Sequence, residues 1–164
     1  GYPNGLNLQL WVMDDGPRVD MCVIIQDQLK AVGINVEIKV FEFGAYVSKT
    51  ALPDKELYFL SWNSSGDGDA SLYPLFHSTQ HGASGNRSFY SNKEVDALLD
   101  KARTSVDQDE RTEIYKKVQD ILQEELPHYT LVYPKLNLAK STKVKGMIFK
   151  KNGYVDLTKA YVEK

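Results

Sequence analysis

Two runs of alternating residues decide the fold: LNLQLWVM at residues 6–13 and INVEIKVF at residues 34–41. Apolar and polar side chains alternate along both runs, which is typical of β-strands. Between them, Asp15 and Pro17 mark the start of a helix whose apolar spacing ends at Gly33. A strand, a helix and a second strand in this order normally give two neighbouring parallel strands. We therefore expect an α/β fold.

The rest of the chain continues this pattern, with further runs of alternating or helical apolar spacing. In chain order, the expected elements are a short helix at residues 44–52, a strand at 57–62, helices that start after Asn92 and after Asp107, and strand-like runs at 129–133, 144–149 and 154–157. We expect the strand at 57–62 to be central or near-central in the sheet. The length fits one core, and we expect a single domain over residues 1–164.

The composition narrows the classes of function. The formal net charge is −2, with 20 basic and 22 acidic residues spread along the chain, so no basic block indicates nucleic acid. No apolar run approaches the ~18 residues that cross a bilayer. Ten Tyr, six Phe and two Trp argue against disorder and suit a domain that binds a ligand through stacking. The one cysteine excludes an internal disulfide and a metal site built from several cysteines.

The segment after the strand at 57–62 is the candidate binding site. Trp62 offers a flat apolar face, and the polar residues that follow it offer hydrogen-bond donors and acceptors. In an open α/β sheet, ligands bind at the carboxyl ends of the strands, where this segment is expected to lie. The alternative is a simple turn between strand and helix, with Asp69 or Ser71 as the N-cap of the helix.

Catalytic and metal-binding patterns are weak. The chain contains no G-x-S-x-G elbow, P-loop or G-x-G-x-x-G fingerprint, and Cys22 falls in the apolar stripe of the first helix. Asp67 and Asp69 are the only close acidic pair in the expected cleft, but no second catalytic group is identified to face them. His77 and His81 lie four residues apart in a loop, which predicts exposed histidines rather than a metal site. We therefore expect no enzyme, cofactor or metal centre, with a cleft hydrolase as the alternative.

Five motifs occur in a specific order along the chain. They are the opening Gly1–Leu6, the helix end Ile25–Ile34, the pair Ser61-Trp62, the set Asn86…Tyr90-Ser91-Asn92…Val95-Asp96, and the long-helix run Asp109-Glu110-Arg111…Tyr115…Gln119-Asp120-Ile121…Pro127. Together they resemble the family 5 extracellular solute-binding proteins, the receptors of peptide and nickel ABC importers. The resemblance covers essentially all 164 residues.

The resemblance implies an α/β lobe like those of type II periplasmic binding proteins, with a mixed open sheet flanked by helices. Residues 1–164 would be the C-terminal lobe of a hinged, two-lobed receptor, and the other lobe would precede Gly1. Such a receptor is non-catalytic and monomeric. It encloses an oligopeptide, a dipeptide or glutathione between its lobes and presents it to the membrane permease of an ABC importer. The resemblance also implies an extracytoplasmic location, with the full-length protein anchored as a lipoprotein; a sensory receptor of the same fold is the alternative.

The expected ligand class follows from a departure from the family pattern. Dipeptide and oligopeptide receptors of this family place an Asp three residues after the Trp, where it pairs with the free amino group of a peptide. Here that position is Ser65, so either Asp67 takes over or the ligand lacks a conventional amino terminus. The run from Trp62 to Ser78 looks most like the glutathione-type branch. Glutathione or a short peptide is therefore the leading ligand, ahead of a nickel chelate.

Two arginines complete the expected site. Arg18 stands at a helix start, where its charge opposes the helix dipole, and Arg87 lies in a polar loop. Both are candidate partners for a ligand carboxylate, and a solvent-exposed arginine is the alternative for Arg18. The full set of expected ligand residues is Trp62, Asn63, Ser64, Ser65, Asp67, Asp69, Arg18 and Arg87.

Overall fold

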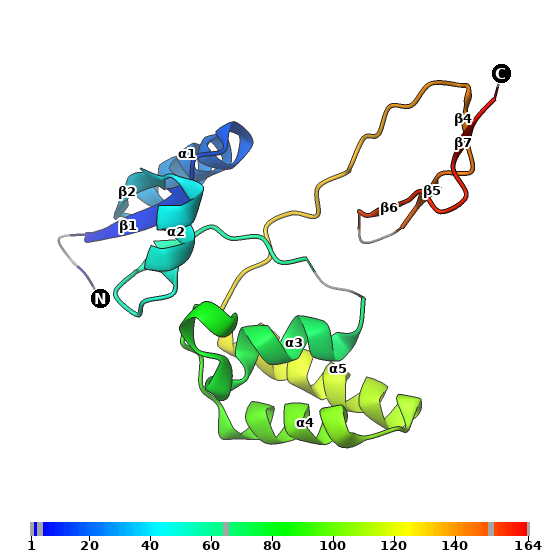
Figure 1. Ribbon diagram of the computed structural model, residues 1–164. Helices are drawn as coiled ribbons and strands as arrows, with labels where there is room; N and C mark the ends of the chain where they lie inside the picture. The colour runs from blue at the N-terminus through cyan, green and yellow to red at the C-terminus, as the bar shows by residue number, and fades with distance from the viewer. Residues whose placement is uncertain (1, 3–4, 64–65, 151–152, 164) are drawn as a thin grey trace.

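The computed structural model describes residues 2, 5–63, 66–150 and 153–163 of the chain (Figure 1). The main sheet contains β1 (Leu6–Met13), β2 (Ile34–Phe41) and β3 (Leu57–Tyr58), in the order β2-β1-β3. Both neighbours run parallel to β1, and β2 pairs with it along its full length. The α/β class and the predicted strand–helix–strand unit are therefore confirmed.

The third strand differs from its prediction in length and in place. The predicted strand spans residues 57–62, but β3 ends at Tyr58 and lies at an edge of the sheet, with β1 in the centre. Phe59 still donates its backbone N–H to the carbonyl of Trp11, at 2.9 Å. The carbonyl of Phe59, however, accepts a hydrogen bond from the Tyr46 hydroxyl at 2.6 Å. The Tyr46 side chain therefore occupies the Phe59 carbonyl, which would accept the next backbone hydrogen bond between β1 and β3.

One face of the sheet is covered by α1 (Gly16–Lys30). The helix begins after Asp15, whose side chain accepts a hydrogen bond from the N–H of Arg18, and the chain turns into β2 at Gly33, with a φ of 83°. Together, α1 and the strands bury a first hydrophobic cluster, consisting of Leu10, Val12, Cys22 and Val36. The single cysteine is thus a core residue, as its helical spacing predicts.

The other face of the sheet carries α2 (Phe43–Thr50). Glu42 caps this helix by accepting hydrogen bonds from the N–H groups of its first turn. Tyr46 of α2 is fully buried, and its ring lies beside Phe41 of β2, which in turn packs on Trp11 of β1 with ring centres 5.2 Å apart. The carboxyl end of the sheet is therefore lined with aromatic rings on this face.

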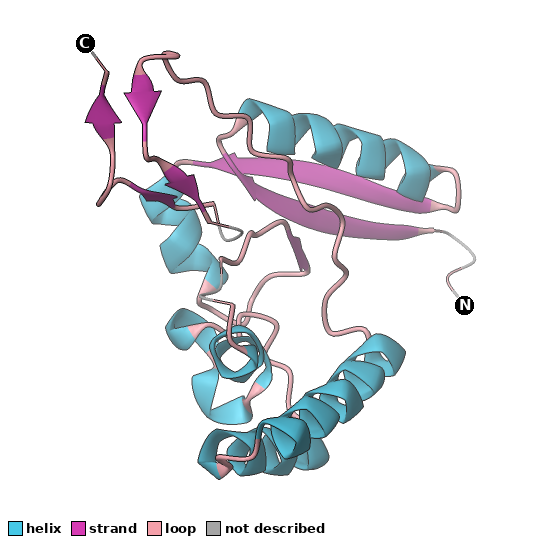
Figure 2. Ribbon diagram, turned by 90° about the vertical axis from the view of Figure 1, so that its right-hand side faces the viewer, coloured by secondary structure: helices cyan, strands magenta, loops and turns pink. Residues whose placement is uncertain are grey.

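A second hydrophobic cluster lies between three helices, α3 (Gly68–Phe76), α4 (Lys93–Thr104) and α5 (Gln108–Glu125). Figure 2 shows them grouped apart from the sheet. Their N-caps are Asp67, Asn92 and Asp107. The buried residues of this cluster are Tyr73, Phe76, Val95, Leu99, Ala102, Ile114, Val118 and Leu122. The described residues thus form two separate hydrophobic clusters, where the length predicts one core. No helix among them is long and apolar enough to cross a membrane.

The C-terminal arm, residues 127–163, follows α5, and its described residues contribute to neither hydrophobic cluster. Residues 128–143 run without regular structure, and all of their side chains are exposed. Two short antiparallel pairs follow, β4 (Val144–Lys145) with β7 (Tyr161–Val162) and β5 (Ile148–Phe149) with β6 (Val155–Asp156). In Figure 1 the arm runs in orange and red away from the helices. The predicted strand at 129–133 is wrong, because no described strand lies beside it to complete a ladder.

Candidate ligand-binding site

The Trp62 loop, residues 61–69, connects the sheet to α3. Trp62 lies beyond the carboxyl end of β3, and 42% of its surface is exposed. Asn63 beside it is exposed as well, whereas Ser64 and Ser65 lie outside the described residues. An indole with this much open surface can stack on a ligand, and the Asn63 amide can both donate and accept hydrogen bonds.

A proline in α3 allows the helix to hold one edge of this indole. In a regular α-helix the N–H of residue 74 donates to the carbonyl of Ala70, but Pro74 has no N–H. The Nε1–H of Trp62 donates to this carbonyl instead, at an N···O distance of 3.4 Å. The hydrogen bond therefore attaches one edge of the indole to α3, and the face of the indole stays exposed.

Both acidic residues of the loop are paired with arginines of the neighbouring helices. The two carboxylate oxygens of Asp67 lie 3.0 and 3.1 Å from Nη2 of Arg111 on α5. Asp69 accepts hydrogen bonds from Nε and Nη2 of Arg103 on α4, at 3.1 and 3.0 Å. Asp67 also caps α3, because it accepts the N–H of Asp69 at 2.8 Å. The helix cap predicted at Asp69 or Ser71 is thus at Asp67.

These contacts favour the ionised form of Asp67. The hydrogen bond from the Asp69 backbone N–H lowers the pKa of the Asp67 carboxyl the most, burial partly opposes this, and the hydrogen bond and charge of Arg111 lower the pKa further. Hydrogen bonds to Tyr115 and to Asp67 raise the pKa of Arg111. At neutral pH the Asp67–Arg111 contact is therefore an ion pair.

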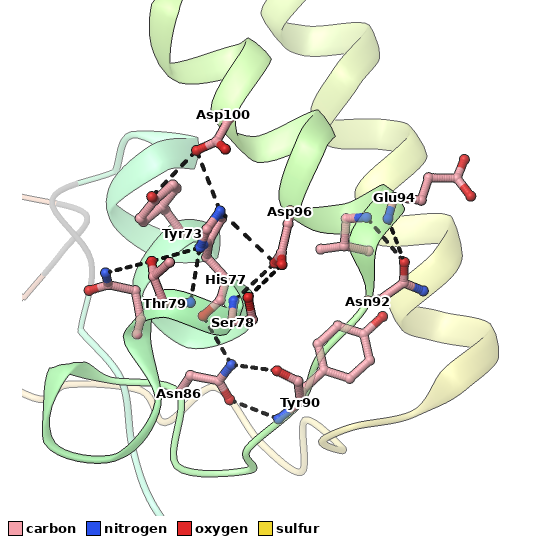
Figure 3. A network of polar contacts seen from close by, with 12 residues as sticks. Tyr73, His77, Ser78, Thr79, Asn86, Tyr90, Asn92, Glu94, Asp96 and Asp100 are labelled. Atoms are coloured by element: carbon pink, nitrogen blue, oxygen red, sulfur yellow. Dashed lines mark hydrogen bonds and ion pairs between the residues drawn. The ribbon is translucent and has the colours of Figure 1, made fainter.

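A stack of rings continues inward from the Asp69–Arg103 pair. The guanidinium carbon of Arg103 lies 3.5 Å from the ring centre of Tyr73, and the Tyr73 ring stacks on His77 at 4.3 Å. His77 is only 4% exposed, with Nε2 at 3.4 Å from Asp100 (Figure 3). The predicted exposure of His77 is therefore wrong, because its ring is enclosed between Tyr73 and α4, whereas His81 is exposed as predicted. No cluster of three or more potential metal-ligating side chains occurs among the described residues.

Asn86 organises the loop between α3 and α4. It is fully buried, and its amide donates hydrogen bonds to the carbonyls of His77 at 3.2 Å and Tyr90 at 2.9 Å (Figure 3). Its oxygen accepts the Tyr90 N–H at 3.1 Å. Nearby, Asp96 accepts hydrogen bonds from the N–H and the hydroxyl of Ser78, at 2.9 and 2.5 Å. The Asn…Tyr-x-Asn…Val-Asp motif of the sequence thus fixes local structure.

Arg18 and Arg87 contact the sheet and α2. The Arg18 guanidinium lies against Sδ of Met13 at the carboxyl end of β1, and 25% of its side chain is exposed. Nη1 of Arg87 donates to the carbonyl of Val47 at 2.7 Å and to the Thr50 hydroxyl at 2.9 Å. Arg87 therefore satisfies the end of α2, where helix carbonyls have no intrahelical donor.

Sequence reasoning does not single out Arg103 and Arg111, the two arginines that hold the loop. Their acidic partners lie 34 and 44 residues away along the chain. An arginine in a charged helix carries no local signal of such a distant contact, so these pairs become visible only in the folded chain.

The described residues of the Trp62 loop, 61–63 and 66–69, do not line either of two open grooves of the protein. These grooves lie elsewhere, one along α1 beside Val23 and Ile24, and one along β1 and β2 beside Asn35 and Glu37. Neither groove is lined by an expected ligand residue. A ligand on Trp62 therefore needs a second wall to be enclosed.

The chain is similar to known solute-binding proteins. Residues 1–83 match the family described as bacterial extracellular solute-binding proteins, family 5 Middle. The glutathione-binding protein GsiB of Escherichia coli is 34% identical over 154 residues, which cover 89% of this chain and 30% of that protein. The chain thus spans about a third of the length of the curated relatives it matches.

Two solved structures extend the similarity to the whole chain. The periplasmic binding protein DppA from Helicobacter pylori, in complex with the peptide STSA, has a TM-score of 0.80 and 33% identity, and the match covers 100% of this chain and 32% of that one. The dipeptide binding protein from Pseudoalteromonas, in complex with Met-Leu, has a TM-score of 0.85 and 26% identity, over 99% of this chain and 33% of that one. The α/β fold is therefore that of a type II periplasmic binding protein over the matched region. The chain belongs to the bacterial extracellular solute-binding proteins of family 5.

Proposed function

We propose that residues 1–164 form one ligand-binding lobe of a receptor for peptide-like solutes, the substrate-binding component of an ABC importer. Its ligand is an oligopeptide, a dipeptide or glutathione. The receptor is non-catalytic and monomeric, and it presents the ligand to the membrane permease of the importer. It works outside the cytoplasm, where a lipid anchor holds the full natural protein at the membrane.

The exposed indole of Trp62 is the observation that carries this proposal. It stands beyond the carboxyl end of a parallel strand, where ligands bind in open α/β sheets. The Asn63 amide beside it matches the donor and acceptor of a peptide bond. Relatives named for binding glutathione, a dipeptide and a peptide support the same ligand chemistry.

The open surface at Trp62 suggests that the ligand is enclosed between two lobes. This lobe contributes the stacking face and the polar groups beside it. Hinged closure of a second lobe would remove the rest of the ligand from water and add the missing contacts. The 164-residue chain alone should therefore bind much more weakly than the full natural protein.

Calorimetric titration of the full natural protein with glutathione, di- to pentapeptides and a nickel–histidine chelate tests this proposal. We expect a Kd of about 10 μM or lower for glutathione or a peptide. Trp62→Ala should weaken this binding by about tenfold or more, because the stacking face is lost. Phe149→Ala removes a ring of similar exposure, 46%, on the C-terminal arm and should leave the affinity unchanged.

Other outcomes would point to other functions. Binding of the nickel chelate alone would reject the peptide-like ligand, and a lack of binding across the panel would reject the ligand class. Turnover of a bound ligand would reject a non-catalytic receptor in favour of a cleft hydrolase. Uptake of the ligand by cells, lost when the receptor gene is deleted, would distinguish transport from a sensory role.

A further inference from the structure

We infer that Asp67 and Asp69 are positioning residues that fasten the Trp62 loop to α4 and α5, and that this loop recognises an uncharged part of its ligand rather than an ammonium group. The second half rests on the proposed function, because it takes the Trp62 face as the surface that meets the ligand. The first half concerns the protein without ligand and can be tested separately.

Each carboxylate of the loop is matched by one guanidinium. Arg103 holds Asp69 in a two-point contact, the arrangement that gives the strongest and most directional arginine–carboxylate pairs. Both oxygens of Asp67 face Nη2 of Arg111, whose side chain is only 20% exposed. The Asp67 side chain is 49% exposed, but Arg111 already neutralises its charge, which weakens its attraction for a ligand ammonium.

The two arginines are themselves held by aromatic residues. The guanidinium carbon of Arg103 lies over the Tyr73 ring of α3, 3.5 Å from its centre, and Arg111 donates a hydrogen bond to the Tyr115 hydroxyl at 3.1 Å. Because the guanidinium groups are fixed on the helices, they determine where the two loop carboxylates lie.

The backbone at Gly68, between the two acids, lies close to the Tyr115 ring of α5. A Cβ added at Gly68 would lie 2.5 Å from Cε2 of Tyr115, a distance that real Cβ atoms essentially never show. Tyr115 therefore packs directly against the Gly68 backbone. The glycine and both ion pairs thus connect the same end of the loop to the helices.

This arrangement selects between the two ligand chemistries that the sequence leaves open. The described loop residues that remain for a ligand are Ser61, Trp62 and Asn63, which are all exposed and uncharged. They suit an amide or an apolar segment. In this arrangement Asp67 does not bind the amino group of a peptide, the role of the family Asp at the position of Ser65. A ligand ammonium would bind to a carboxylate outside this loop.

The experiment uses substitutions that separate charge from helix capping. Asn is as good an N-cap as Asp, so Asp67→Asn keeps the cap of α3 and removes the charge that Arg111 needs. Asp69→Asn removes the charge that Arg103 needs. Without ligand, both variants should show faster hydrogen exchange at the amides of residues 66–71. In the full natural protein, both substitutions should weaken the binding of glutathione, trialanine and N-acetyl-trialanine by a similar factor, roughly three- to tenfold in Kd.

A charge exchange and a matched control complete the design. Asp67→Arg combined with Arg111→Asp restores the ion pair with reversed polarity but not the cap of α3, so it is compared with Asp67→Arg alone, which lacks the same cap. The double variant should recover affinity and exchange protection relative to that single variant. If N-acetyl-trialanine does not bind, the double variant distinguishes the two roles of Asp67. A direct contact between Asp67 and a ligand ammonium would be abolished in this variant, whereas a positioning role would be restored. Glu113→Gln breaks an exposed ion pair with Lys116 on the same helix and should change neither measurement.

The outcomes separate the two halves of the inference. Unchanged hydrogen exchange in both Asn variants would overturn the fastening role. A loss confined to the free-amine probes, with no rescue by the charge exchange, would overturn the recognition of an uncharged group. If the unsubstituted protein binds neither these three probes nor any di- to pentapeptide of the calorimetric panel, the proposed function fails, and hydrogen exchange alone then tests the fastening role.

Discussion

A single buried amide, that of Asn86, connects the segment between α3 and α4, whose described regular structure is two short 3-10 helices, Ser78–Gln80 and Gly82–Ser84. Its side chain donates to two backbone carbonyls and accepts one N–H, and its backbone forms an isolated β-bridge with His81. Asn86→Ala would leave the Tyr90 N–H without its acceptor and remove one of the two hydrogen bonds at each of the His77 and Tyr90 carbonyls, and we expect the free energy of unfolding to fall by about 2 kcal/mol. Urea unfolding measures this change. Asn137→Ala, at an exposed position of the C-terminal arm, is the control and should have no effect; a loss equal to that of the control would contradict the role of Asn86.

At the scale of residues, the sequence identifies chemical types better than it identifies contacts. Trp62 is exposed beyond the sheet, as its place after an apolar strand indicates. His77 looks like a loop histidine and is instead enclosed by Tyr73 and α4, because burial depends on the tertiary packing of a helix that begins 16 residues later. The pairing of Asp67 with Arg111 is hidden for the same reason.

At the scale of elements, local signals predict local structure. The capping residues before α4 and α5 and the alternation in β1 and β2 act within a few residues of each element, and these elements form as predicted. The run at 129–133 has the same strand-like composition but stays unpaired. A strand needs a neighbour to complete its hydrogen bonds, and that neighbour is not encoded in the run itself.

The interruption of α3 by Pro74 gives a prediction at this scale. Pro74→Ala supplies the missing N–H, which would donate to the Ala70 carbonyl and displace the Trp62 indole. We expect a more stable helix and a more mobile indole, with iodide quenching of tryptophan fluorescence increased while Trp11, at 8% exposure, contributes little. Pro134→Ala in the exposed arm is the matched control. Equal quenching in all three proteins would show that the Ala70 contact does not hold the indole.

At the scale of the whole molecule, two hydrophobic clusters and an arm outside both predict that the arm adds little stability. Neither cluster contains a residue after Leu122, although the His128 ring stacks on Phe76 at 4.8 Å. A chain of residues 1–128 keeps this stack, and its Tm should lie within about 3 °C of that of the 164-residue chain. Circular dichroism during heating measures both. A fall of about 10 °C or more would mean that the arm packs on the rest of the protein.

The burial of Cys22 has a practical consequence for detection. Its side chain is inaccessible in the first cluster, and burial raises the pKa of the thiol, so the native cysteine is a poor target for thiol-reactive dyes. A cysteine introduced at exposed Asn63 would then be labelled selectively, without any need to replace the native one. A fluorophore at that place, next to the indole of Trp62, would respond when a solute arrives. The protein is therefore suited to conversion into an optical sensor.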